Sequence, residues 1–186
     1  MSKEQVNTRF GVIVAIIVLA AASRFISPFN FSPIGAIALF GAAYFSKKIW
    51  AFIIPLAALW VSNLILDNVI YAAFYDGFQW FSNPFVYLAF AAMTALGSGL
   101  LEKVNVVTVL LSAVGGTAVF FLVSNFGAWL EMPHIYPRNF GGLAAAYAAG
   151  LAFLQNTLLG NVLYCGLLFG AFELLKYRFP RLAKAA

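Results

Sequence analysis

The chain has 186 residues, of which 63% are hydrophobic and only 9% are charged, and its formal net charge is +5. Because an ordinary soluble domain is about a quarter charged, this chain has too few charged side chains to cover a globular surface in water. Its basic residues stand at the ends of apolar runs and form no basic stripe with interleaved aromatic side chains, which argues against nucleic-acid binding. The composition therefore predicts an all-α integral membrane protein, with the lipid bilayer around a single transmembrane domain over residues 1–186.

Six apolar segments follow one another along the chain, and we expect about six transmembrane helices from them. They cover residues 10–26, 34–45, 49–66, 84–101, 104–122 and 140–175. Because a helix needs about 20 residues to cross a hydrocarbon layer of ~30 Å, the third to fifth segments fit comfortably, whereas the second is too short unless flanking residues extend it. The first segment also has the pattern of a signal peptide, but Arg24 and the aromatic stretch behind it favour a retained span.

The last segment, residues 140–175, is too long for one straight span and is interrupted by Gln155 and Asn156. Two full spans would leave only about 14 residues for the first of them, which is short of a crossing. We therefore expect a re-entrant or half-helix segment over residues 141–153, followed by a true span from Thr157. Irregular backbone at membrane depth is tolerated only where it is buried in protein or lines a cavity, so this segment is also a candidate part of a binding site.

The basic residues are divided unequally between the two ends of these predicted spans. Nine stand at one end, namely Lys3, Arg9, Lys47, Lys48, Lys103, Lys176, Arg178, Arg181 and Lys184. Arg24 and Arg138 stand at the other end. Because cytoplasmic loops carry an excess of Lys and Arg, we expect both termini in the cytoplasm. The three outward connections, residues 27–33, 67–83 and 125–140, are the long ones, and binding groups gather in long connections.

Two of the outward connections hold polar side chains beside apolar spans. The first connection holds Asn30, and Arg24 stands just before it. Ser32, near its end, is a plausible N-cap for the second span. The start of that helix would suit a carboxylate, phosphate or carbonyl group, although a simple loop-to-helix entry is the more favoured interpretation. Where the third span meets the second connection, Asn63 and Asp67 are four residues apart and share a helix face. A carboxylate near membrane depth usually faces a wet cavity or a partner, so Asp67 is either a solvated cap or a ligand contact.

The third connection is the richest in groups that bind ligands, although its Trp and Tyr also suit a membrane-interface belt. Together with the amide of Asn156, we expect its side chains to face the same outer chamber as the first two groups. The candidate substrate-binding residues are Arg24, Asn30, Asn63, Asp67, Asn125, Trp129, His134, Tyr136, Arg138 and Asn156. Two guanidinium groups on the outer side indicate a ligand that bears a carboxylate, a phosphate or amide carbonyls.

Signatures of enzymes and of metal sites are missing from the sequence. There is no dinucleotide-binding, Walker-type or HExxH motif, and the single histidine argues against a multi-histidine metal site. The stretch Leu96-Gly97-Ser98-Gly99 lacks the first glycine of the intramembrane serine protease motif, and Ser98 is predicted roughly a membrane thickness from His134. We therefore expect no catalytic residue, no cofactor and no metal; an arginine ladder or a chain of buried acids, typical of channels and pumps, is also missing.

Four short stretches carry a resemblance to a known group of proteins. They read Ala21-Ala22-Ser23-Arg24-Phe25-Ile26, Asn30-Phe31-Ser32-Pro33-Ile34-Gly35-Ala36, Ser124-Asn125-Phe126-Gly127 and Asn156-Thr157-Leu158-Leu159-Gly160. Over residues 10–175 the chain resembles a family of uncharacterised bacterial membrane proteins, which is itself similar to the substrate-binding S-components of energy-coupling-factor (ECF) vitamin transporters, including cobalamin-specific ones.

The resemblance implies a multi-pass protein of the bacterial inner membrane that binds a vitamin-like molecule, such as cobalamin or a related cofactor precursor, for uptake. It also implies an energising transporter module as partner, which in S-components docks on an Ala-x-x-x-Ala surface of the first span. Here Gly11 and Ala15 have that spacing, but bulky Leu19 follows them. The alternative is a non-transporting structural subunit of a membrane complex; the polar outer connections favour transport.

Overall fold

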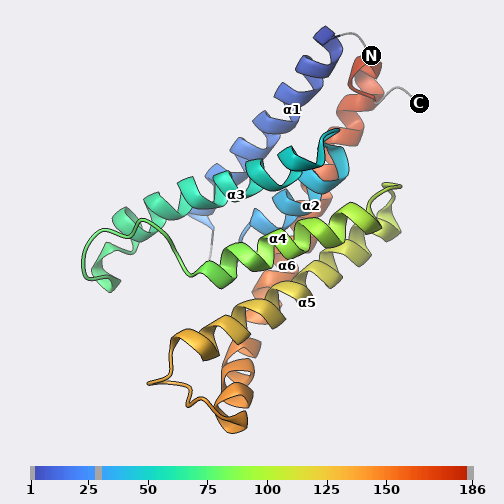
Figure 1. The fold of residues 1–186 in the computed structure, drawn as a ribbon. Coiled ribbons are helices and arrows are strands. Elements are labelled where there is room, and N and C mark those ends of the chain that lie inside the picture. Colours follow the sequence, from blue (N-terminus) through green and yellow to red (C-terminus); the bar gives the residue numbers. More distant parts are fainter. Residues whose placement is uncertain (1–2, 28–30, 184–186) are drawn as a thin grey trace.

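The computed structural model describes residues 3–27 and 31–183, which hold six α-helices and no strand (Figure 1). The helices are α1 (Lys3–Ala22), α2 (Ile34–Tyr44), α3 (Lys48–Ile65), α4 (Pro84–Leu100), α5 (Val106–Glu131) and α6 (Phe140–Arg178). Short helical turns are η1 (Ser23–Ile26), η2 (Leu66–Ile70), η3 (Ala72–Phe74) and η4 (Pro180–Leu182). Four stretches, Lys3–Ile26, Lys48–Ile70, Val106–Glu131 and Phe140–Arg178, are long and apolar enough to cross a membrane. The predicted all-α membrane fold is confirmed.

The short helix α2 lies in the middle of the bundle and packs against each of the other five α-helices (Figure 1). Ten of its 11 residues are buried. Eleven residues rise about 16 Å, roughly half of the hydrocarbon layer, and the flanking residues do not lengthen the helix. The second apolar segment is therefore as short as the sequence predicted, and α2 is a half-length helix enclosed by longer helices.

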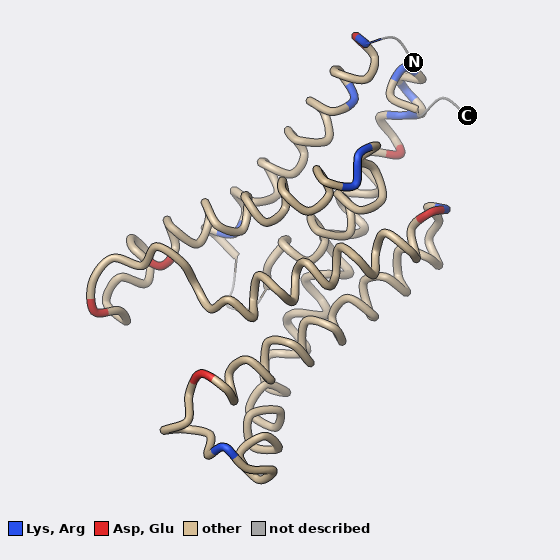
Figure 2. Tube along the Cα trace, viewed as in Figure 1, with Lys and Arg blue, Asp and Glu red and all other residues tan. Residues whose placement is uncertain are grey.

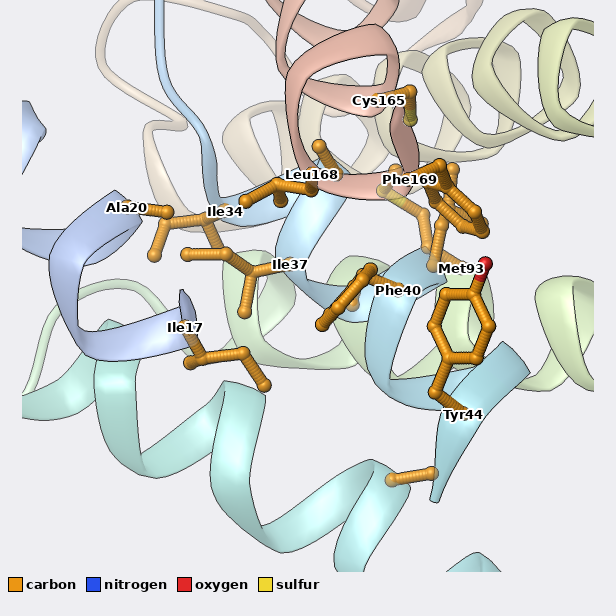
Figure 3. Packing of buried hydrophobic residues seen from close by; sticks show 14 of the residues in the cluster. Ile17, Ala20, Ile34, Ile37, Phe40, Tyr44, Met93, Cys165, Leu168 and Phe169 are labelled. Atoms are coloured by element: carbon orange, nitrogen blue, oxygen red, sulfur yellow. The ribbon is translucent and has the colours of Figure 1, made fainter. Parts of the chain in front are cut away.

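Aromatic and branched aliphatic side chains pack around α2 (Figure 3). Phe40 meets Phe169 and Phe172 of α6 edge to face, with ring centroids 5.5 and 5.6 Å apart. On the other side, Ile17 of α1 faces Ile37 (Figure 3). Edge-to-face pairs contribute about 0.5–1.5 kcal/mol beyond their buried area. Because lipid tails are as apolar as these side chains, close packing of this kind holds the helices together in a membrane.

The predicted re-entrant segment over residues 141–153 is wrong. Helix α6 continues without a break from Phe140 to Arg178, a length of 39 residues. The side chains of Gln155 and Asn156 are exposed on the surface of α6. These two polar residues therefore lie within the helix and do not interrupt its backbone hydrogen bonds. A helix of this length measures about 58 Å, roughly twice a hydrocarbon layer.

The first part of α6 packs along the second part of α5, which also ends later than expected. Helix α5 runs to Glu131, so Asn125 and Trp129 lie on a helix and the true connection covers only residues 132–139. The Tyr147 hydroxyl donates a hydrogen bond of 3.0 Å to the Leu122 carbonyl, and the Tyr147 ring lies 5.6 Å from that of Phe121. These contacts make α5 and α6 a helical hairpin, which replaces the predicted break.

Basic side chains gather at one end of the bundle. Figure 2 shows most Lys and Arg residues at the end where the chain begins and ends, whereas acidic residues stand at both ends. The end with the termini also holds the α2–α3 turn, with Lys47 and Lys48, and the α4–α5 turn, with Lys103. The unequal division of basic residues that the sequence predicted is therefore present in three dimensions.

The contact between α2 and α6 can be tested at Gly35. A Cβ atom there would lie 2.9 Å from Met93 Cε and would overlap the Asn161 side chain, which is itself bonded to Thr117 at 2.8 Å. We expect Gly35→Ala to lower the free energy of unfolding by about 1–3 kcal/mol through overpacking. Gly11→Ala is the control, because nothing lies within 4 Å of its Cβ position. Denaturation in detergent measures both variants, and a Gly35→Ala protein as stable as the control would contradict this packing.

Candidate functional site

Arg24 lies in the helical turn η1, at the end of α1 away from the termini, and points toward α3. Its Nη1 donates hydrogen bonds to the Ser62 hydroxyl and, at 2.8 Å, to Asn63 Oδ1. Ser62 and Asn63 are 3% and 7% exposed. The turn η1 is in turn joined to α6, because the Tyr164 hydroxyl lies 2.9 Å from Ser23 Oγ and 3.1 Å from Ser27 Oγ.

A relay of hydrogen bonds leads from Arg24 to a carboxylate. Asn63 Nδ2 donates to the Ser82 hydroxyl at 2.8 Å, and that hydroxyl donates to Asp67 Oδ2 at 2.7 Å. These five side chains, which we name the Arg24 cluster, come from η1, α3, η2 and the segment before α4: Arg24, Ser62, Asn63, Asp67 and Ser82. The cluster pairs one cation with one anion, but only through two neutral residues.

Hydrogen bonds hold the segment between η3 and α4 against the end of α3 and η2. This position of the segment brings Ser82 into the cluster. Asn68 exchanges two hydrogen bonds with the backbone of Gln79, at 2.9 and 2.7 Å. Trp60 Nε1 donates to the Trp80 carbonyl at 3.0 Å. In the same connection, partial burial and the nearby Asp67 carboxylate raise the pKa of the Tyr75 phenol above its ordinary value.

A cavity of about 250 Å³ opens beside the cluster. Arg24, Ser32 and Asn63 supply polar groups to its wall. The apolar part of the wall is largely aromatic, with Phe31, Tyr71, Phe90 and Phe120. We name this space the Arg24 cavity. Aromatic walls with a few placed hydrogen-bonding groups are the usual character of a small-molecule site.

The first turn of α2 begins at the wall of the Arg24 cavity. Ser32 Oγ accepts a hydrogen bond of 3.3 Å from the Ile34 amide, but the N-cap position of α2 falls on Pro33 and not on Ser32 as expected, and the helix begins at Ile34. The first amides of a helix carry a partial positive charge. The guanidinium and this helix end therefore give one side of the cavity a positive potential.

Residues 4–182, almost the whole chain, match the model of a protein family. The chain belongs to the family of unknown function DUF6580. No curated protein and no solved structure matches it. The likeness to S-components therefore rests on the motifs of the sequence, and the ligand and the energising module that it implies remain predictions.

In this DUF6580 member, the structure separates the predicted site residues into groups instead of one chamber. Arg24, Asn63 and Asp67 come together in the Arg24 cluster. Asn125 lies in a second cavity, of about 230 Å³ between α5 and α6, and its Nδ2 donates to the Phe121 carbonyl at 2.8 Å. Phe120 lines both cavities.

The residues predicted in the third connection mostly hold that connection in place. Trp129 Nε1 donates to the Pro137 carbonyl at 3.0 Å, and Arg138 Nη2 donates to the Leu130 carbonyl at 3.0 Å. His134 is exposed and Tyr136 half-buried. None of these four lines the Arg24 cavity. The single outer chamber expected from the sequence is therefore not formed by them.

Asn156 lies outside the Arg24 cluster, and three contributors to the site were missed by the sequence analysis. Asn156 is exposed on α6, and Asn30 lies outside the described residues. The missed residues are Ser62, Ser82 and Tyr164. Ser62 stands beside Asn63 within an apolar run, a signal that could have found it, whereas nothing in the sequence places Ser82 or Tyr164 near Arg24. Among residues 3–27 and 31–183, no three His, Cys, Asp or Glu side chains gather as a metal site.

The relay in the Arg24 cluster predicts an energetic coupling between Asn63 and Ser82. Each change to Ala should destabilise the protein, because it leaves a partly buried polar partner without its bond. In the double variant the second change should cost less, with an interaction energy of about 0.5–3 kcal/mol. Unfolding of the two single variants and the double variant in detergent measures this energy. Additivity within about 0.3 kcal/mol would mean that the relay does not exist.

Proposed function

We propose that this protein binds a small, vitamin-like organic molecule with a carboxylate or another acidic group in the Arg24 cavity and takes part in its uptake. The observation that carries the proposal is the half-buried guanidinium of Arg24 at the wall of a largely aromatic cavity inside a bundle of apolar helices. An ionisable residue among membrane helices is costly and usually faces a substrate path or a partner. The function would resemble that of an S-component.

The electrostatics of the cluster support an acidic ligand. A guanidinium carries five N–H donors, and the two bonds to Ser62 and Asn63 come from Nη1 alone and end on neutral groups. The link to the Asp67 carboxylate runs through Asn63 and Ser82. A ligand carboxylate beside Arg24 would form charge-assisted hydrogen bonds, which are stronger than those of neutral groups. The first turn of α2 adds a favourable dipole.

The size of the cavity narrows the ligand class. A volume of about 250 Å³ lies just below the range of about 300–1,000 Å³ typical of drug-sized ligands. A corrinoid is much larger than a drug-sized molecule. Cobalamin therefore does not fit this cavity as it stands, and a smaller vitamin or cofactor precursor suits it better.

A partner surface of the S-component kind is compatible with α1. Gly11 and Ala15 are exposed on this helix, and nothing lies within 4 Å of the Cβ position of Gly11. Leu19, one turn further on, is also exposed. A strip of small residues lets another helix approach closely in lipid. An energising module docked there is part of the proposal.

Purification with the native ligand tests the proposal. We expect small molecules released from the detergent-purified wild-type protein to include one acidic compound close to one per chain. Arg24→Gln keeps donors for Ser62 and Asn63 but removes the charge. Loss of charge-assisted bonds worth about 1.5–3 kcal/mol should lower retention about tenfold or more. Mass spectrometry of the released compounds, quantified per chain, gives the readout.

Arg138→Gln is the matched control, because it removes the same charge from an exposed side chain that does not line the Arg24 cavity. Retention should be unchanged in this variant, and the melting temperature of both variants should show that each is folded. A wild-type protein that carries no compound above the level of an unrelated membrane protein would favour a structural subunit. Equal losses in the two variants would place the ligand outside the Arg24 cavity.

The proposal places the protein in the bacterial inner membrane, with both termini in the cytoplasm and the Arg24 cavity toward the outer side. The support is the gathering of basic residues around the termini (Figure 2) and the positive-inside rule. Alkaline phosphatase should be inactive when fused to the C-terminus and active when inserted between Asp76 and Gly77. Activity at both positions, or at neither, would reject this arrangement.

A further inference from the structure

Arg9 of α1 is a buried cation at the end of the bundle that holds the termini, far along α1 from Arg24. It is only 6% exposed. Its Nη2 donates a hydrogen bond of 3.0 Å to the Tyr44 carbonyl, at the last residue of α2. Its Nε and Nη1 are buried and have no hydrogen-bond partner. Unpaired buried donors of a charged group are costly, so these N–H groups call for an acceptor from outside the chain.

An acidic side chain of α6 does not supply this acceptor. Glu173 of α6 is close enough to act on Arg9 electrostatically, but its carboxylate is already engaged. It accepts a hydrogen bond of 2.5 Å from the Tyr44 hydroxyl and forms an ion pair of 2.8 Å with Lys176. In the part of the chain that the structure describes, no carboxylate forms an ion pair with Arg9.

A cavity of about 330 Å³ adjoins Arg9, and we name it the Arg9 cavity. Lys47 brings a second cation to its wall and Asn7 an amide, and no carboxylate is among the described residues that line it. Another part of the wall is aromatic. The Phe10 ring lies 5.5 Å from that of Phe45 and 5.7 Å from that of Trp50, the latter edge to face. The cavity therefore joins two cations to an apolar surface.

We propose that the Arg9 cavity binds a phosphate group, with Arg9 and Lys47 as its cationic partners. The unpaired Nε and Nη1 of Arg9, the Lys47 ammonium and the Asn7 amide provide more donors than the two oxygens of a carboxylate would use. Guanidinium groups match phosphate geometry well. The group would belong either to an anionic lipid, whose acyl chains would lie along the aromatic wall, or to a soluble phosphate compound.

The position of the cavity is compatible with a lipid. It lies at the basic end of the bundle, and basic pockets between helices at the cytoplasmic face hold anionic headgroups. Trp50 is a residue type that collects at the membrane interface. This inference does not depend on the Arg24 cavity, which lies at the opposite end of α1.

Binding of matched lipids to the full chain in detergent tests the proposal. Dioctanoyl phosphatidylglycerol carries a phosphate, and dioctanoylglycerol has the same acyl chains without it. We expect the first to bind about tenfold or more tightly than the second, because of the charge-assisted bonds to phosphate. Lys47→Gln and Arg9→Gln should each reduce this preference several-fold. Native mass spectrometry or a fluorescence titration gives the affinities.

Lys48→Gln is the matched control, since Lys48 adjoins Lys47 in sequence but does not line the cavity. Its affinity for the phospholipid should stay within about twofold of the wild type, as expected for a change away from the contact. If the Arg9→Gln protein fails to fold, the phospholipid affinities of Lys47→Gln and Lys48→Gln still test whether the Arg9 cavity binds phosphate. Equal effects of these two changes, or equal binding of the two lipids with no binding of phosphate, would overturn the proposal.

Inorganic phosphate distinguishes the two sources of the group. If millimolar phosphate binds with the same dependence on Arg9 and Lys47 while the phospholipid gains nothing over dioctanoylglycerol, the site takes a soluble phosphate compound. If the phospholipid binds and phosphate alone does not, the site takes a lipid headgroup. Both results support a phosphate site, and failure of both probes rejects it.

Discussion

The length of α2 is the constraint on which the rest of this bundle depends. Eleven residues, ten of them buried, cannot cross a hydrocarbon layer, so both ends of the helix stop inside or close to the protein interior. The five longer helices that enclose α2 must therefore supply partners for its free amides and carbonyls. Space also remains beyond each end. The Arg24 cavity lies at the first turn of α2 and the Arg9 cavity at its last residue.

Buried polar groups in this bundle are arranged as short relays between helices. The Asn161 amide donates to the Thr117 hydroxyl at 2.8 Å, and both residues are 2% exposed. The Arg24 cluster joins η1 to α3 and to the segment before α4 in the same way. Without water to compete, each unmade bond would cost more than it does at a surface. These relays thus specify which helices are neighbours. Apolar packing alone specifies the neighbours only weakly in lipid.

The sequence predicted the positions of the helices well, because these depend on local composition. It predicted the contacts of individual side chains poorly, because these depend on how the helices pack. Apolar runs located every helix, and the spacing of Asn63 and Asp67 predicted their proximity, which the structure shows between the end of α3 and η2. The break at Gln155 and Asn156 was wrong because an exposed polar side chain does not oppose a helix. Trp129 and Arg138, predicted as ligand contacts, donate hydrogen bonds to the Pro137 and Leu130 carbonyls, and no local pattern predicts these bonds. Arg9 was counted only as a topological signal, since no local pattern shows that α2 ends beside it.

The two arginines meet opposite ends of the same helix dipole, and this difference separates their roles. Arg9 donates to the Tyr44 carbonyl, where the negative end of α2 stabilises part of its charge, although Nε and Nη1 stay without a partner. Arg24 lies by the cavity at the positive end, where the dipole opposes a guanidinium. Four neutral or acidic side chains offset that repulsion through the relay to Asp67. A ligand anion in the Arg24 cavity would be attracted by the guanidinium and the dipole together, so this end of α2 is the better place for selective binding. At the other end, the negative end of the helix partly opposes the attraction of an anion by Arg9 and Lys47.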